Sequence, residues 1–188
     1  NTHNKKMASL PKLTQTEYKN KLMNYKFLMK KFIVTTRFTN ETWTENNKYR
    51  KEQTHNGCVY CSPDPISAKI KRNSILFVLE MNNEENSILG IGLIKNNPII
   101  NSFQVYNEKN YNRYVYLGEH RIDRNEMDVQ EELIMKAFDI LCFTGNKHMK
   151  RGQGLKCFPL EMLFKISEKV DLVEFISCMF KKRIKSNT

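Results

Sequence analysis

The stretch GNKHMKRGQGLK, residues 145–156, combines residue types that bind phosphate. Its four cations are Lys147, Lys150, Arg151 and Lys156. Glycines at positions 145, 152 and 154 allow the backbone to turn its amide groups toward an anion. His148 could bond a phosphate or stack on a base. A solvated basic loop has the same composition, and the sequence leaves both interpretations open.

Aromatic residues alternate with arginines in two other places. The first group is Trp43, Tyr49, Arg50 and Tyr60, and the second is Tyr106, Tyr111, Arg113, Tyr114 and Tyr116. Unpaired bases stack on such rings while arginine contacts phosphate, although tyrosines in strands are also ordinary packing residues. We predict nucleic-acid contacts at Trp43, Tyr49, Arg50, Tyr60 and Arg113, and at Lys147, His148, Lys150, Arg151 and Lys156.

Signatures of catalysis and of cofactor binding are incomplete. Cys58 and Cys61 have the spacing of half a zinc site, but no second closely spaced pair of ligands follows. The carboxylates of residues 119–128 alternate with Arg121 and Arg124, which favours surface ion pairs over a metal-dependent nuclease. Gly90 and Gly92 lack the third glycine of a dinucleotide site. We therefore predict no metal, no cofactor and no catalytic residue.

The charge of the chain is unevenly distributed. The 188 residues carry a net charge of +11, and residues 1–57 hold twelve basic and four acidic side chains. Residues 58–127 hold eight of each, so a basic N-terminal third precedes a neutral body. This arrangement is common in proteins that bind nucleic acid. Solubility alone would also account for the excess charge.

The cysteines and the hydropathy of the chain indicate the cellular compartment in which the protein works. Five cysteines at irregular spacing do not resemble a secreted disulfide framework. No apolar run approaches the roughly 18 residues of a membrane span, and the polar N-terminus does not resemble a secretory signal. We expect an intracellular protein of the cytoplasm or nucleus, or a virion component.

Helical periodicity marks both ends of the chain. Residues 17–32 form a predicted basic amphipathic helix, with Thr16 as its cap and an apolar stripe that packs on the body. The run FIVTTRF (32–38) fits a strand or a continuation of that helix. Residues 128–143 predict a helix with acids in its first turn, and further helices follow Pro159.

The middle of the chain predicts strands. The polar residues 39–58, which contain Trp43, predict an irregular loop, and the prolines at 63 and 65 predict a turn. Strands are expected at 74–81 and 87–96, then within 97–106, and again at 111–122. The fold class is therefore α+β, with a mainly antiparallel sheet at 58–122 that is either open or closed as a barrel. A basic arm and helix (1–38) would precede a single domain (39–188).

Three features of residues 40–125 occur in a fixed order: the Trp-bearing segment, the stretch SILFVLEMNNEENSILGIGLIKN and the later Tyr-rich strand. In this order they resemble the PUA-like superfamily, which includes the EVE and YTH barrels. The resemblance implies a small barrel that binds RNA or a modified base in an aromatic pocket. Because the chain has a single tryptophan, Tyr49 or Tyr60 would have to complete such a pocket. The whole chain also resembles proteins of large AT-rich DNA viruses, which implies a virion or virus-factory protein.

These observations predict a non-enzymatic nucleic-acid-binding protein. RNA or another single-stranded nucleic acid is favoured, with a basic face on phosphates and an aromatic pocket for a base. The first alternative is a structural or assembly protein, such as a minor virion component, with acidic protein partners. The second alternative is a metal-dependent nuclease.

Overall fold

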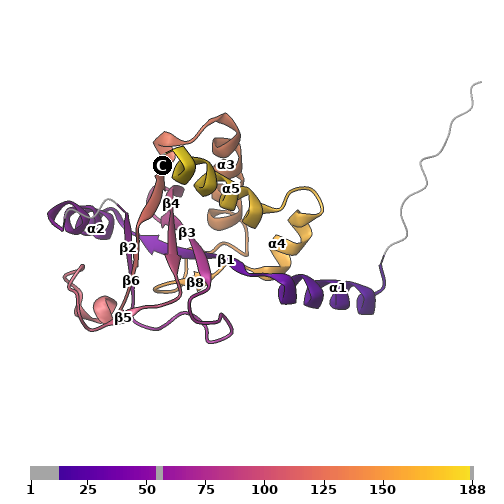
Figure 1. Cartoon of the computed structure of the whole chain (residues 1–188), viewed down its shortest axis with the longest axis horizontal. Coiled ribbons are helices and arrows are strands. Elements are labelled where there is room, and N and C mark those ends of the chain that lie inside the picture. The colour runs from indigo at the N-terminus through magenta and orange to yellow at the C-terminus, as the bar shows by residue number, and fades with distance from the viewer. Residues whose placement is uncertain (1–12, 54–56, 187–188) are drawn as a thin grey trace, which may run out of the picture.

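A mixed five-stranded sheet forms the centre of the computed structural model, which describes residues 13–53 and 57–186 (Figure 1). The strand order is β7-β4-β3-β1-β8. These strands are β1 (Lys31–Phe38), β3 (Ile75–Asn82), β4 (Ser87–Lys95), β7 (His120–Asp123) and β8 (Lys156–Cys157). β1 and β3 run parallel, and the other neighbours run antiparallel.

A smaller antiparallel sheet packs against one face of the central sheet. Its order is β2-β6-β5, and its strands are β2 (Cys58–Ser62), β6 (Tyr114–Gly118) and β5 (Ile99–Ile100). Within the described residues the two sheets stay separate and do not close into a barrel. The expected α+β class is therefore confirmed, and the sheet is open rather than closed.

Helices complete the fold. The α-helices of the described residues are α1 (Gln15–Leu28), α2 (Asn40–Glu52), α3 (Val129–Phe143), α4 (Leu160–Ser167) and α5 (Leu172–Ser186). Two short 3₁₀ helices are η1 (Lys109–Arg113) and η2 (Arg124–Glu126). In Figure 1, α3, α4 and α5 gather beside the central sheet, and α1 extends away from the body. None of the helices in the described ranges is long and apolar enough to cross a membrane.

The central strands are buried on both faces. Ile33 belongs to a core cluster beneath α3, α4 and α5, whereas the next residue, Val34, belongs to a second cluster beneath the smaller sheet. A strand that is covered on both faces needs apolar side chains on both faces, so its sequence is a continuous apolar run rather than an alternating one. This explains the apolar runs in β1 and β3. The run at 32–38 is thus a strand, and it lies between β3 and β8.

Glycines allow the two sheets to approach closely. A Cβ atom added at Gly92 would lie 2.0 Å from the Tyr60 hydroxyl, and one at Gly118 would lie 2.1 Å from the Leu93 carbonyl oxygen. The Tyr60 hydroxyl donates to buried Glu80 at 2.6 Å, and Arg121 binds the same carboxylate through two nitrogens. Glu80 and Arg121 therefore each have hydrogen-bond partners within a buried polar network between the two sheets.

The prediction for residues 39–58 was wrong. They were expected to form an irregular loop, but most of them form α2. Thr39 and Thr42 make a capping box, in which each hydroxyl accepts a hydrogen bond from the other residue's backbone amide. Buried Asn46 donates to the Val59 carbonyl oxygen at 2.8 Å, so a polar residue occupies a core-facing position of the helix. A pattern search for apolar residues therefore misses this helix.

Other boundaries differ as well. The third expected strand, within 97–106, is reduced to Ile99–Ile100, and the fourth divides into η1, β6 and β7. The helix expected at 17–32 begins at Gln15, with Thr14 rather than Thr16 as its cap, and ends at Leu28. α1 contains no buried residue; Tyr18 and Tyr25 contact Phe164 of α4.

Candidate functional site

A pocket lies where the parallel strands β1 and β3 end. Because the two strands are parallel, their carboxyl ends meet at the same edge of the sheet, a common position for ligand sites in sheets with parallel strands. The cavity has a volume of about 190 Å³. Clefts for drug-sized ligands usually measure about 300–1,000 Å³, so this one suits a single ring system or another small group.

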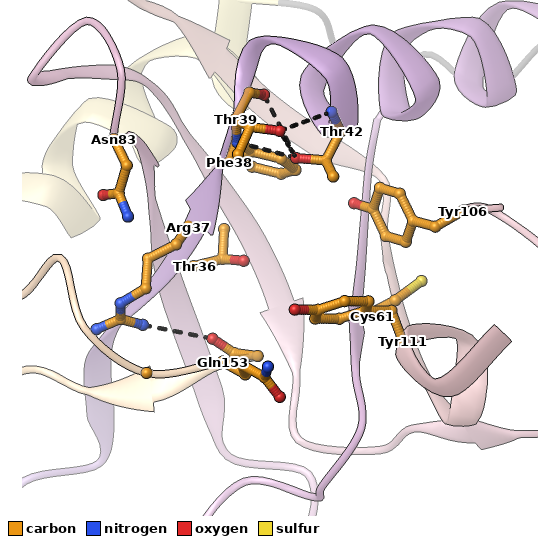
Figure 2. Close-up of a pocket in the computed structure, with 12 residues that line it drawn as sticks. Thr36, Arg37, Phe38, Thr39, Thr42, Cys61, Asn83, Tyr106, Tyr111 and Gln153 are labelled. Atoms are coloured by element: carbon orange, nitrogen blue, oxygen red, sulfur yellow. Dashed lines mark hydrogen bonds between the residues drawn. The ribbon is translucent and has the colours of Figure 1, made fainter. Parts of the chain in front are cut away.

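Five separate segments form the pocket. The lining residues are Thr36, Arg37, Phe38, Thr39, Thr42, Cys61, Asn83, Tyr106, Tyr111, Gly152, Gln153 and Gly154. Thr36, Phe38 and Cys61 are buried, whereas Thr39 and Gln153 are exposed at its rim. Figure 2 shows Tyr106 and Tyr111 on one side of the pocket, with Gln153 of the glycine-containing loop across from them.

The two tyrosines differ in how firmly they are held. Tyr106 is buried, and its hydroxyl accepts a hydrogen bond from Asn46 at 2.9 Å. Burial raises its pKa well above the ordinary value, so the hydroxyl stays protonated. Tyr111 is half-buried and meets Tyr106 edge to face, with 6.4 Å between ring centroids. Part of the Tyr111 ring is therefore accessible for contact with a ligand.

Arg37 supplies the positive charge of the pocket wall. Its Nε donates to the Met149 carbonyl oxygen at 2.7 Å, and Nη1 donates to the Gly154 carbonyl oxygen at 3.4 Å. None of the ion pairs within the described residues includes Arg37. Burial lowers its pKa from the ordinary value. A half-buried cation whose partners among the described residues are all neutral is costly, and an anion would compensate it.

The glycine-containing loop, residues 145–156, is ordered by contacts at both ends. Besides the two bonds from Arg37, Asn83 donates to the Lys150 carbonyl oxygen at 2.9 Å. Gly152 and Gly154 have positive φ values of 101° and 64°, which favour glycine. A Cβ atom at Gly154 would also lie 2.0 Å from the Ser62 hydroxyl oxygen. The loop is thereby held beside the pocket.

The cations of this loop take different positions. Lys147, Arg151 and Lys156 are exposed. Lys150 is half-buried, and its ammonium group donates to Asn86 at 2.8 Å. His148 is half-buried, and its Nδ1 accepts from the Lys150 amide at 3.3 Å. The loop lines the pocket with Gly152, Gln153 and Gly154, and none of the ten side chains predicted from sequence to contact nucleic acid is among the lining residues.

The aromatic residues chosen from sequence lie elsewhere. Trp43 packs on Phe38, with 4.9 Å between ring centroids, and the guanidinium groups of Arg50 and Arg121 lie 5.4 and 5.2 Å from its ring centre. Tyr49 is half-buried against the core beneath the smaller sheet. The rings of Trp43 and Tyr49 are thus largely occupied by packing.

Tyr60 and Arg113 are also apart from the pocket. Tyr60 is 1% exposed, and its hydroxyl donates to Glu80, so no ring face is open to a base. Arg113 is exposed and lies over Tyr114, at 5.5 Å from the ring centroid. A cage built from Trp43, Tyr49 and Tyr60 does not form. The pocket tyrosines come instead from the second aromatic group of the sequence.

Sequence reasoning predicted none of the pocket-lining side chains as ligand contacts, and Arg37, Thr36 and Cys61 are three that it missed. One signal was available for Arg37, because it is the single charged side chain inside the β-branched run of β1 that follows Lys31. Cys61 was considered only as a metal ligand. No sequence pattern places these residues together, since they meet only through the pairing of the sheets.

The cysteines and carboxylates do not gather around a metal position. No group of three or more histidine, cysteine, aspartate and glutamate side chains could hold a metal ion within residues 13–53 and 57–186. His55 lies outside the described residues. Burial, with Glu80 as a further cause, raises the pKa of Cys58 to about 12. Arg121 pairs with Asp123, as the alternating charges predict, but also with buried Glu80. Arg124 pairs with Glu132 and Asp139, which lie outside the alternating stretch.

Comparisons with protein-family models, with curated proteins and with solved structures found no match to this chain.

Proposed function

We propose that the protein binds single-stranded nucleic acid without altering it chemically. One unpaired base enters the pocket beside Tyr106 and Tyr111, and the adjoining phosphates contact Arg37 and the exposed cations of the glycine-containing loop. The observation that carries this proposal is the pairing of a cation lacking a carboxylate partner with an accessible aromatic ring in one small cavity. Single strands are recognised by this combination of ring stacking and positive charge.

Size and polarity of the pocket support the same proposal. Its volume suits one ring system, and its polar groups, the Thr36 hydroxyl and the Tyr106 hydroxyl among them, can bond the edge of a base. The bases of a duplex are stacked and paired, so none of them is free to enter the pocket. We therefore expect a preference for single strands over duplexes.

Paired tyrosine variants test the proposal. Tyr111→Ala should weaken binding of a labelled single-stranded oligonucleotide by about 1–3 kcal/mol, because a stacking ring is lost. Tyr49→Ala, which removes the same side chain from α2 outside the pocket, should leave the affinity of the folded protein unchanged, because Tyr49 does not line the pocket. Fluorescence anisotropy at fixed salt measures both. Equal losses for the two variants, or a larger loss for Tyr49→Ala, would remove the pocket from the account.

The same samples separate binding from cleavage. The labelled strand should keep its full length during incubation with magnesium, because the proposed site holds the ligand without a reacting group. Shortened product that disappears with Arg37→Gln would instead support the nuclease alternative.

A second candidate function, a structural or assembly protein, is favoured by one exposed face of α3. Val129, Leu133 and Ile140 share this face and are 77%, 55% and 63% exposed. Apolar residues grouped on a surface often mark a protein interface. Sedimentation of wild type beside a Leu133→Lys/Ile140→Lys variant tests this candidate. An assembly protein should lose its association in the variant, whereas a simple nucleic-acid-binding protein should sediment identically.

A further inference from the structure

A second hollow lies at the other end of β1, between α1 and residues 69–74. We call it the basic groove, and its volume is about 690 Å³. Its cations are Lys26, Lys30, Lys69, Lys71 and Arg72. They come from two segments that are distant in sequence, α1 with the residues after it and the segment before β3. The fold therefore concentrates five positive charges around one hollow.

Among the described residues, these five charges have no carboxylate partner nearby. The part of the basic groove that the described residues form is lined by no carboxylate. Within the described residues none of the five cations forms an ion pair, although Arg72 donates to the Asn97 side chain at 3.0 Å. Clustered like charges in a concave surface attract a polyanion and raise its local concentration. Charge complementarity thus points to an anionic occupant.

The groove also offers an aromatic surface. Phe27 projects from α1 with 86% of its surface exposed, and Phe32 is half-buried at the start of β1. Positive charge interleaved with accessible rings is the arrangement that binds single strands without regard to sequence. This observation favours a nucleic-acid strand over an acidic peptide, which would need no exposed ring.

The pocket and the basic groove lie near opposite ends of one strand. Lys30 precedes β1, whereas Arg37 is near its end. A strand advances about 3.3 Å per residue, so the two sites are about 20–25 Å apart. A stacked single strand advances about 3.4 Å per phosphate, so about seven nucleotides would span them. The short edge strand β8 lies between the sites, because it pairs with Val34 and Thr35 in the middle of β1.

We propose that the basic groove is a second contact site for the same nucleic-acid strand whose base occupies the pocket, with the connecting nucleotides crossing the exposed edge at β8. This inference rests on the proposed function. It adds a minimum ligand length, since a trinucleotide can reach only the pocket and a dodecanucleotide can reach both sites.

Strand length and paired lysine variants test the proposal. Two linked contacts can exceed either alone by about 10²–10⁴-fold, so an oligothymidylate dodecamer should bind at least about a hundredfold more tightly than the trimer. Lys26→Ala/Lys71→Ala should remove most of this gain. Each lost phosphate contact lowers the salt slope by about 0.7 for single strands, so the dodecamer slope should fall by about 1.4. Binding of the trimer should stay unchanged.

A variant with the same change in charge serves as the control. Lys136→Ala/Lys169→Ala removes two exposed lysines from α3 and the segment after α4, and neither residue lines the basic groove. It should retain the full gain with length. If both double variants lose affinity equally, net charge rather than the basic groove explains the gain, and the proposal is wrong.

Failure of this proposal is distinguishable from failure of the proposed function. If the trimer does not bind, or if Tyr111→Ala does not weaken it, the pocket is not the base site. If the trimer depends on Tyr111 but the dodecamer binds no more tightly, only the basic groove is excluded. The proposal is also overturned if polyglutamate or phosphatidylserine vesicles, rather than the dodecamer, lose their binding in Lys26→Ala/Lys71→Ala.

Cysteine accessibility provides a second measurement. Cys157 is exposed on β8, between the two sites, and Cys178 is exposed on α5. The dodecamer should slow labelling of Cys157 by a thiol reagent, whereas the trimer should not, and Cys178 should react at an unchanged rate. Unprotected Cys157 in the dodecamer complex would exclude the path across β8.

Discussion

The partners of Arg37 and Arg124 indicate which of the two arginines binds a ligand and which stabilises the fold. Among the described residues, the hydrogen bonds of the Arg37 guanidinium group go to carbonyl and hydroxyl oxygens. The Arg124 guanidinium group binds Glu132 and Asp139, each at 2.8 Å. A charge that is neutralised by carboxylates of the protein contributes to folding, and one whose protein partners are neutral is available to an anionic ligand.

The same substitution should affect binding at Arg37 and folding stability at Arg124. Arg37→Gln should weaken oligonucleotide binding by about 1.5–3 kcal/mol, the usual contribution of a hydrogen bond to a charged group. Arg124→Gln should leave binding unchanged and reduce the free energy of unfolding, because Glu132 and Asp139 lose their partner. Anisotropy titrations and urea unfolding of both variants measure the two quantities. Loss of binding in Arg124→Gln alone would contradict this assignment.

The five cysteines should divide into two classes of reactivity. Cys58, Cys61 and Cys142 are buried, and burial raises the pKa of each thiol, to about 12 for Cys58 and Cys142. Only the thiolate reacts readily. At neutral pH a thiol reagent should therefore label the two exposed residues, Cys178 and Cys157, with Cys157 reacting more slowly because partial burial raises the pKa of its thiol. It should reach the other three cysteines only after denaturation. Rapid labelling of Cys58 in the native protein would show that the contact between the sheets opens.

At the scale of elements, the ion pair between α3 and α5 makes stability dependent on pH. Arg183 donates to both carboxylate oxygens of buried Glu131, at 2.8 and 2.7 Å. This hydrogen bonding holds the pKa of Glu131 below its ordinary value of 4.5. A lowered folded-state pKa stabilises the protein fully above the unfolded value, and this contribution disappears as pH falls through the folded value.

Glu131→Gln should therefore reduce the free energy of unfolding at neutral pH, by about 1.5–3 kcal/mol for a hydrogen bond to a charged group. The difference from wild type should shrink as the pH falls below 4.5, because protonation removes the same charge from wild type. Urea unfolding across this pH range checks the effect. Glu161→Gln, at an exposed carboxylate of α4, is the control, and a pH-independent difference for Glu131→Gln would contradict the account.

Elements with strong local signals were predictable from sequence. The helix expected at 128–143 is α3, because Asp128 and Glu131 form a capping box and the apolar residues recur at helical spacing. The strands expected at 74–81 and 87–96 are β3 and β4, since both are apolar runs bounded by turn residues. α2 was not predicted because its inner face carries buried Asn46 beside Trp43 and Tyr49.

At the scale of the whole molecule, the pocket depends on contacts that no local pattern encodes. The second aromatic group and the glycine-containing loop were each recognised in the sequence. Their meeting with Arg37 follows from the parallel pairing of β1 with β3 and from the close approach of the two sheets at Gly92 and Gly118. The prediction of Tyr60 as a nucleic-acid contact was wrong for the same reason, because the close approach of the two sheets buries its ring.

Photocrosslinking tests most directly whether a base occupies the pocket. A single-stranded oligonucleotide carrying one iodouridine would be irradiated in complex with the protein, and the modified peptide identified by mass spectrometry. The account predicts crosslinks to Tyr106 or Tyr111, and their loss in the presence of excess unlabelled strand. Crosslinks confined to Trp43 or Tyr49, or the absence of any crosslink when binding is saturated, would contradict it.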